Sequence, residues 1–283
     1  MSPGRAREAG RRPFEAITGP GLMAGAVTVD IGGGYRLPVV GLGTWNVTGD
    51  DVVPSVRAAI ECGYRHIDTA YGYGNEAGIS QALREAGIGR EEVFLTSKIP
   101  PRRIGFEEET LAGSLRQLET DYLDLWLIHA PPDTADASAR LWEFVIGARE
   151  QGRVRAIGVS NYSTEQIDHL AAVTGVMPAV NQIRWSPALF DPGRLAQLRE
   201  RSIALEGFSA IRLTDLEDPR LVAVAAAHGV TTAQVLVRWQ VEHEIVGIPR
   251  SVHPDRIREN FSVWDFELTA GELALIDSMS SVA

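Results

Sequence analysis

The sequence of 283 residues contains a single cysteine, Cys62, so a disulfide within the chain is impossible. A chain without disulfides fits the reducing cytoplasm, where we expect the protein to reside. No run approaches the roughly 18 consecutive apolar residues that a transmembrane helix needs, so we expect no association with a membrane. Positive charge is also in short supply. The formal net charge of −10 would repel phosphate backbones, which argues against nucleic acid as a partner.

The first 25 residues lack a periodic apolar pattern and contain several arginines, glycines and prolines. We therefore expect residues 1–25 to form a disordered tail. The apolar segment of a secretory signal is missing and serine is scarce, which argues against targeting. Met23 lies just before the first strand pattern and is an alternative translation start.

Glycine is used for turns. Residues 27–40 alternate and break at Gly32, Gly33 and Gly34, which predicts a β-hairpin with positive φ at the turn. From Pro38 onward, strand and helix patterns alternate, which predicts parallel strands joined by right-handed crossovers. The predicted strands are residues 39–42, 64–67, 93–96, 123–128, 156–159, 179–182, 204–208 and 245–248. Helices are predicted at 51–61, 75–86, 107–118, 135–150, 164–173, 192–201, 218–228 and 231–241, and a closing helix begins at 255–259.

Two α/β architectures fit this alternation. An open doubly wound sheet usually carries a G-x-G-x-x-G turn after its first strand. Residues 41–46 (GLGTWN) lack both the third glycine and a helix that follows it. We therefore predict a (β/α)8 TIM barrel with an N-terminal hairpin, and residues 26–283 as one domain.

Polar and aromatic residues stand where the predicted strands end, which in a closed barrel is where reactive groups gather. Asp68 ends the second strand, Tyr73 follows five positions later, and Asn75 is placed to cap the next helix. The other strands end in Thr44 and Trp45, Lys98, His129, Ser160 and Asn161, Gln182, Phe208 and Ser209, and Arg250 and Ser251.

Several of these segments resemble, in the same order, the motifs of the aldo-keto reductase family. The similar segments are residues 41–46, 65–76, 95–99, 123–129, 157–161 with 181–182, and 248–260. The similarity extends over residues 27–277 and is greatest to the prokaryotic branch that resembles 2,5-diketo-D-gluconate reductase. It implies NADPH-dependent reduction of an aldehyde or ketone to an alcohol, with Asp68, Tyr73, Lys98 and His129 as a catalytic tetrad.

The four residue types suit that chemistry. Carbonyl reduction needs a hydride at carbon and a proton at oxygen, and Tyr73 would supply the proton. A lysine cation at about 4 Å contributes roughly 4 kcal/mol, or about three pKa units, so Lys98 would bring the pKa of Tyr73 toward neutrality. Asp68 would keep Lys98 charged and aimed, while His129 would donate a hydrogen bond to the substrate oxygen. Alone, Lys98 could be an exposed strand end and His129 a buried core residue, but their coincidence on successive strand ends favours catalysis.

The resemblance also implies a site for NADP(H). Phe208 offers a face for the nicotinamide where the family usually has tyrosine, and Ser160, Asn161 and Gln182 would bind its carboxamide. Arg250 and Arg256 suit a 2′-phosphate, which favours NADP over NAD. The remaining contacts expected for the cofactor are Thr44, Trp45, Ser209, Ser251, Glu259 and Asn260.

Apolar walls predict a small carbonyl substrate. Those expected to line the pocket are Trp45, Tyr73, His129 and Trp185, with Trp126 or Ala130, and Ile211. Ala130 and Arg184 depart from the family pattern, so the natural substrate stays open. His66 shares a strand face with Asp68, yet no His-x-His pair accompanies it, and we expect no metal. Relatives of this size are often monomers, which we expect here.

Two other functions remain open at this stage. The barrel could bind NADP without turnover, as a redox sensor or regulatory subunit, or it could use the same pocket for isomerisation or elimination. The intact tetrad argues against the sensor. Oxidation of NADPH with a panel of simple aldehydes separates these functions.

Overall fold

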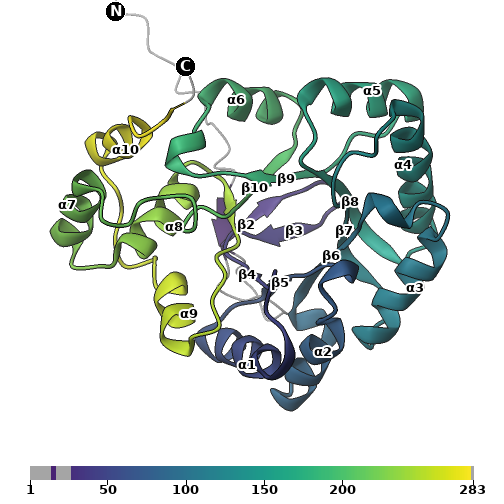
Figure 1. The fold of residues 1–283 in the computed structure, drawn as a ribbon, viewed down its shortest axis with the longest axis horizontal. Helices are drawn as coiled ribbons and strands as arrows, with labels where there is room; N and C mark the ends of the chain where they lie inside the picture. Colours follow the sequence, from purple (N-terminus) through teal and green to yellow (C-terminus); the bar gives the residue numbers. More distant parts are fainter. Residues whose placement is uncertain (1–13, 17–26, 282–283) are drawn as a thin grey trace, which may run out of the picture.

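The computed structural model describes residues 14–16 and 27–281. Within them, eight parallel strands lie at the centre of a ring of helices (Figure 1). The strands are β4 (Leu42–Gly43), β5 (His66–Asp68), β6 (Phe94–Ile99), β7 (Leu123–Ile128), β8 (Val154–Ser160), β9 (Val180–Arg184), β10 (Ala204–Phe208) and β11 (Val246–Gly247). Each strand pairs with the next one in sequence, and the Gly41 amide donates to the Gly247 carbonyl at 2.9 Å. This bond joins the first strand to the last, so the predicted (β/α)8 barrel is confirmed.

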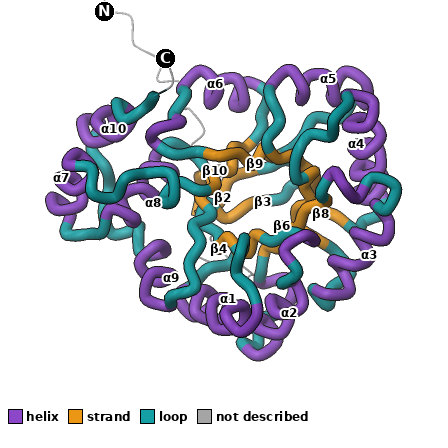
Figure 2. The backbone as a smooth tube through the Cα atoms, viewed as in Figure 1, coloured by secondary structure: helices purple, strands orange, loops and turns teal. Residues whose placement is uncertain are grey.

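The helices cover the outside of the strands (Figure 2). They are α1 (Val52–Cys62), α2 (Glu76–Glu85), α3 (Glu107–Gln117), α4 (Ala135–Glu150), α5 (Thr164–Thr174), α6 (Pro192–Glu200), α7 (Pro219–His228), α8 (Thr232–Glu242), α9 (Pro254–Phe261) and α10 (Ala270–Asp277). Short 3-10 helices are η1 (Gly49–Asp51), η2 (Tyr71–Tyr73), η3 (Arg90–Glu92), η4 (Pro101–Arg103) and η5 (Pro187–Leu189). The predicted helices agree within a few residues. Helix α10 was not predicted, although Thr269 and Glu272 form a capping box at its start.

The predicted N-terminal hairpin is confirmed and closes one end of the barrel. Strands β2 (Val27–Asp30) and β3 (Arg36–Pro38) pair antiparallel, and Gly32, Gly33 and Gly34 have φ of 82°, 64° and 82°. Leu37 of this hairpin packs in one cluster with Phe94 and Leu125 of the barrel strands. The hairpin therefore plugs the amino-terminal end of the barrel and leaves the opposite end for a site.

Part of the segment expected to be disordered is a strand. Strand β1 (Phe14–Ala16) pairs antiparallel with β2, so the prediction of disorder is wrong for residues 14–16. The outer edge of a hairpin strand presents backbone donors and acceptors that another strand satisfies. Residues 1–13 and 17–25 of the expected tail, with Met23, lie outside the described residues.

The helices are short compared with a membrane-spanning segment. Among the described residues, no single helix is long and apolar enough to cross a membrane. Helices α7 and α8 reach that length and composition only as a pair bent by 88°.

We predict that the barrel does not tolerate a side chain at Gly158 in β8. A Cβ atom there would lie 2.6 Å from the Val180 carbonyl oxygen and 2.8 Å from Leu127 Cδ2. Gly158→Ala should lower the free energy of unfolding by about 1–3 kcal/mol, measured by urea denaturation. Gly147→Ala in α4 is the control, because no atom lies within 4 Å of its Cβ position, and it should stabilise by roughly 0.5–1 kcal/mol. Equal midpoints of urea denaturation for the two variants would show that a side chain at position 158 does not clash with Val180 and Leu127.

Candidate active site

A buried ion pair lies at the carboxyl ends of β5 and β6. Asp68 is opposite Thr96 in the sheet, so Lys98 stands two residues further along the same face. Lys98 Nζ donates to Asp68 Oδ1 at 2.7 Å and to the Thr69 carbonyl at 2.8 Å. The side chain of Lys98 has no exposed surface. Burial on its own would lower the pKa of Lys98, but the charge of Asp68 outweighs it and the pKa is raised. Lys98 is therefore a fixed cation.

Tyr73 and His129 complete the group. Tyr73 ends η2, and its hydroxyl lies 3.4 Å from His129 Nε2. Lys98 Nζ lies 5.1 Å from the centre of the Tyr73 ring. The structure thus brings together the four residues that the sequence assigned to the tetrad.

The pKa of Tyr73 differs from the expectation. Burial raises it, Lys98 lowers it, and the net effect is a raised pKa. The predicted shift toward neutrality is therefore wrong for the protein alone, because removing the phenol from water disfavours phenolate more than one cation favours it. The hydroxyl keeps its proton at neutral pH, which is the form needed by a proton donor.

His129 is a neutral imidazole. It follows β7, and its amide donates to the Ile99 carbonyl at 2.9 Å. Burial, the charge of Lys98 and the charge of Arg102 lower the pKa of His129 to about 3. A neutral ring both donates and accepts, so it can bond a substrate oxygen beside Tyr73.

Asn75 does not act as predicted. It occupies the residue before α2, but its side chain makes no capping bond. Its Nδ2 instead donates to the carbonyls of Thr44 (2.9 Å) and Val47 (3.0 Å), and its Oδ1 accepts from Thr69 Oγ1 at 2.7 Å. Asn75 therefore ties the loop after β4 to the loop that carries Tyr73.

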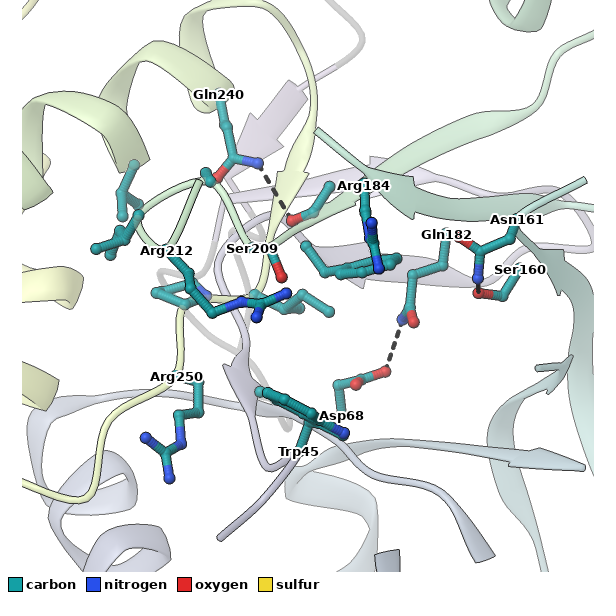
Figure 3. A pocket seen from close by; sticks show the side chains of 18 of the residues that line it. Trp45, Asp68, Ser160, Asn161, Gln182, Arg184, Ser209, Arg212, Gln240 and Arg250 are labelled. Atoms are coloured by element: carbon teal, nitrogen blue, oxygen red, sulfur yellow. Dashed lines mark hydrogen bonds between the residues drawn. The ribbon is translucent and has the colours of Figure 1, made fainter. Parts of the chain in front are cut away.

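A cavity of about 420 Å³ opens above these residues (Figure 3). This volume suits a small organic ligand. Of the predicted site residues, it is lined by Trp45, Asp68, Tyr73, His129, Ser160, Asn161, Gln182, Phe208, Ser209, Ile211 and Arg250. Side chains from both halves of the chain therefore meet at this one end of the barrel.

Polar groups beside the cavity are held in place. Asn161 Nδ2 donates to Ser160 Oγ at 2.9 Å, and Asn161 itself has φ of 62°. Gln182 Nε2 donates to Asp68 Oδ2 at 2.8 Å, as the dashed line in Figure 3 marks. Ser209 also has positive φ, 64°. Such backbone strain in residues other than glycine is often found at binding sites.

Other predicted residues lie away from the cavity lining. Thr44 is buried, and its hydroxyl donates to the Asp68 carbonyl at 2.9 Å. Trp185 is 1% exposed and packs edge-on against Phe190, with 6.1 Å between ring centres. Trp126 is fully buried and packs in the same way against Phe144.

The predicted adenine and phosphate residues lie after β11. Ser251 is buried and accepts from the His253 amide at 3.0 Å. In α9, Arg256 and Glu259 are exposed, whereas Asn260 is buried.

The prediction missed several residues of this region. Arg212, Val237 and Gln240 line the cavity, and Arg212 lies over the Trp45 ring at 5.4 Å. Arg212 belongs to a loop and gives no periodic signal. Glu206 is buried on β10 and accepts a hydrogen bond from Gln182, which lines the cavity. A glutamate inside a short apolar strand was the signal that could have identified it.

The chain matches the model described as "Aldo/keto reductase family" over residues 39–214 and 190–281. It belongs to the aldo/keto reductase family. This enzyme shares 36% identity over 276 residues with morphine 6-dehydrogenase of Pseudomonas putida. The alignment covers 92% of this chain and 93% of the relative. It shares 35% identity over 257 residues with methylglyoxal reductase DkgA of Escherichia coli K12, covering 90% and 94%. The expected family and its prokaryotic branch are confirmed.

Solved structures of the family share the fold of this reductase. An aldo/keto reductase from Brucella melitensis superposes with a TM-score of 0.86 at 38% identity, covering 90% of this chain and 99% of that one. A Bombyx mori aldo-keto reductase in complex with NADP superposes with a TM-score of 0.83 at 32% identity, covering 90% and 93%.

We predict that His129 stays neutral well below neutral pH. Its folded-state pKa of about 3 lies below the ordinary value of 6.5, so the unfolded chain binds this proton first. His129 therefore contributes stability above about pH 6.5 that is lost as the pH falls toward 3. NMR of the imidazole, assigned with a His129→Gln variant, should show no titration between about pH 5 and 8. A midpoint near 6.5 would show that the ring is solvated.

Proposed function

We propose that this aldo-keto reductase reduces aldehydes or ketones with NADPH, taking hydride from nicotinamide C4 and a proton from Tyr73. The observation that carries the proposal is the geometry: the Tyr73 hydroxyl and the His129 imidazole lie 3.4 Å apart and line a cavity, with the buried Lys98 ammonium beside them. The NADP-bound relative from Bombyx mori supports the choice of cofactor.

The tetrad residues would divide the proton transfer among them. Tyr73 and His129 lie close enough together to bind one substrate oxygen, to which Tyr73 would give its proton and His129 a hydrogen bond. Charge then develops on the phenol oxygen. Lys98 already faces it and is held by Asp68, so the interaction strengthens without rearrangement. Preorganised charge of this kind favours the transition state over the ground state.

The chain offers groups for each part of the cofactor. Phe208 presents an aromatic face in the cavity, and Ser160, Asn161 and Gln182 would bind the carboxamide. Arg250 donates to the Asn46 carbonyl at 2.7 Å, which leaves other N–H groups of its fork for a phosphate.

The rest of the dinucleotide would lie toward α9. Arg256 would join Arg250 on the 2′-phosphate, with Glu259, Asn260 and Ser251 near the adenosine. Thr44, Trp45 and Ser209 would border the cofactor between its two ends.

The substrate would be a small carbonyl compound. Trp45, which is 53% exposed, forms a wall of the cavity together with Tyr73, His129 and Ile211. Trp185 would support this wall from the core. We also propose that residues 26–283 form one domain and that the protein is a monomer. We propose the cytoplasm as its location, because a chain with one cysteine forms no internal disulfide and fits a reducing compartment.

Tyr73→Phe tests the proton donor. Removing only the hydroxyl should lower kcat/KM for a simple aldehyde by about 10²–10⁴-fold. The dissociation constant for NADPH, followed by fluorescence, should stay nearly unchanged. Tyr71→Phe in the same 3-10 helix is the matched control and should retain activity. If Tyr73→Phe still reduces the aldehyde, Tyr73 is not the proton donor. If the native protein binds NADPH tightly but reduces no aldehyde, the sensor function is favoured instead.

Arg256→Ala tests the preference for NADP. Loss of one charged hydrogen bond costs about 1.5–3 kcal/mol, so kcat/KM for NADPH should fall roughly 10–150-fold. The value for NADH should not change, because NADH lacks the phosphate. Arg258→Ala is the control, since Arg258 pairs with Asp255 at 2.9 Å within α9. Equal losses with both cofactors would remove Arg256 from the phosphate site.

A further inference from the structure

Glu206 is a buried carboxyl group to which the proposed reaction assigns no part. It lies on β10 opposite Gln182 of β9, and its side chain is 0% exposed. Its Oε2 accepts from Gln182 Nε2 at 3.1 Å. Its Oε1 lies 3.6 Å from His66 Nε2 and has no hydrogen-bond partner within the described residues.

Gln182 connects this carboxyl to the tetrad. The same Nε2 atom that donates to Glu206 also donates to Asp68 Oδ2 at 2.8 Å. With both amide hydrogens used by carboxyl groups inside the barrel, Oε1 is the atom of Gln182 that remains for the cavity. The carboxyl groups of Asp68 and Glu206 therefore share one amide, while Lys98 is bonded to Asp68.

The ionisable groups that face Glu206 do not balance a second negative charge. They are His66 and Asp68 on β5, Lys98 on β6 and Tyr73 on η2. Burial and the charge of Lys98 lower the pKa of His66 to about 3, so its ring is neutral, and its Nε2 lies 3.1 Å from Thr96 Oγ1. Within this network one ammonium thus faces the carboxyl groups of both Asp68 and Glu206, and a third buried carboxyl group, Glu76, also feels its charge.

A buried carboxylate without its own cation is costly, whereas a protonated carboxyl needs only a donor and an acceptor. Gln182 supplies the donor, and the neutral ring of His66 supplies an acceptor near Oε1. Burial and the charge of Asp68 raise the pKa of Glu206 to about 8. At neutral pH the group therefore holds its proton.

We propose that Glu206 is a positioning residue for the tetrad: its protonated carboxyl fixes the Gln182 amide without opposing the charge of Lys98 at Tyr73. The proposal rests on the proposed function, because its effect is exerted on the proton of Tyr73. When Glu206 releases its proton to solvent in alkaline solution, a second carboxylate faces Lys98. Negative charge at Glu206 raises the pKa of Tyr73, so phenolate then forms less readily.

Alcohol oxidation with NADP⁺ gives the first test, because this direction needs the phenolate form of Tyr73. In Glu206→Gln, the oxygen of the introduced amide still accepts from Gln182, and its nitrogen faces His66. The side chain at position 206 then stays uncharged at every pH. In the plot of kcat/KM against pH, the rising limb should lie roughly one pH unit lower for the variant than for the native enzyme. This is the effect expected for removing a unit charge at an effective dielectric of about 20. A change in stability alone would not move this limb.

Glu76→Gln is the matched control. Glu76 is also a buried carboxyl group, and it accepts from Ser97 Oγ at 2.6 Å without bonding Gln182 or Asp68. Its replacement should leave the limb in place. A limb that stays fixed in Glu206→Gln, or that moves equally in both variants, would overturn the proposal.

The second test needs no turnover. Lys98 is the only lysine in the sequence, so lysine labelled with ¹³C at Cε gives a single protein resonance. Its chemical shift should titrate with a midpoint near pH 8 in the native enzyme, and this transition should vanish in Glu206→Gln. If the native resonance is flat between about pH 6.5 and 9.5, Glu206 does not change its charge beside Lys98 in this range, and the proposed pH dependence is overturned whether or not the variant folds. An enzyme that shows this transition but reduces no carbonyl would instead refute the proposed function.

Discussion

The ion pair between Asp68 and Lys98 is the interaction on which the active site depends. An ammonium with no exposed surface is stable only if its hydrogens find partners and its charge is balanced. Asp68 and the Thr69 carbonyl supply two of those partners, which leaves the third N–H direction for the side of Tyr73. Since the parallel register of β5 and β6 sets the position of both residues, the barrel itself aims the charge.

Burial shapes the site in two opposing ways. The absence of water strengthens the effect of Lys98 on its neighbours, but it also disfavours every charged form. The outcome is a protonated Tyr73, a neutral His129 and a charged Lys98. These are the protonation states required to reduce a carbonyl, so the dry interior selects the competent form before a substrate arrives.

The sequence predicted what periodicity and strand ends encode. Strand β7 and helix α4 have the predicted bounds, because alternation and helical spacing are local signals. Asn75 failed as a cap because its partners, Thr44 and Val47, lie 31 and 28 residues away, and no local pattern reports such contacts. Strand β1 depends on the free edge of β2 in the same way. The raised pKa of Tyr73 was missed because residue types do not reveal how much water surrounds them.

The glycines of residues 41–46 follow from the same crowding inside the barrel. A Cβ atom on Gly41 would lie 2.3 Å from His66 Nδ1, and one on Gly43 would lie 2.7 Å from the Ile248 carbonyl oxygen. Gly43 is therefore small because the first and last strands meet there, and its amide donates to the Pro249 carbonyl at 3.0 Å. Gly41 is small because the His66 ring needs the space beneath Asp68. The glycines at positions 41 and 43 thus serve barrel closure. Closure in turn keeps His66, Glu206, Asp68 and Lys98 away from water, while Tyr73 and His129 line the cavity.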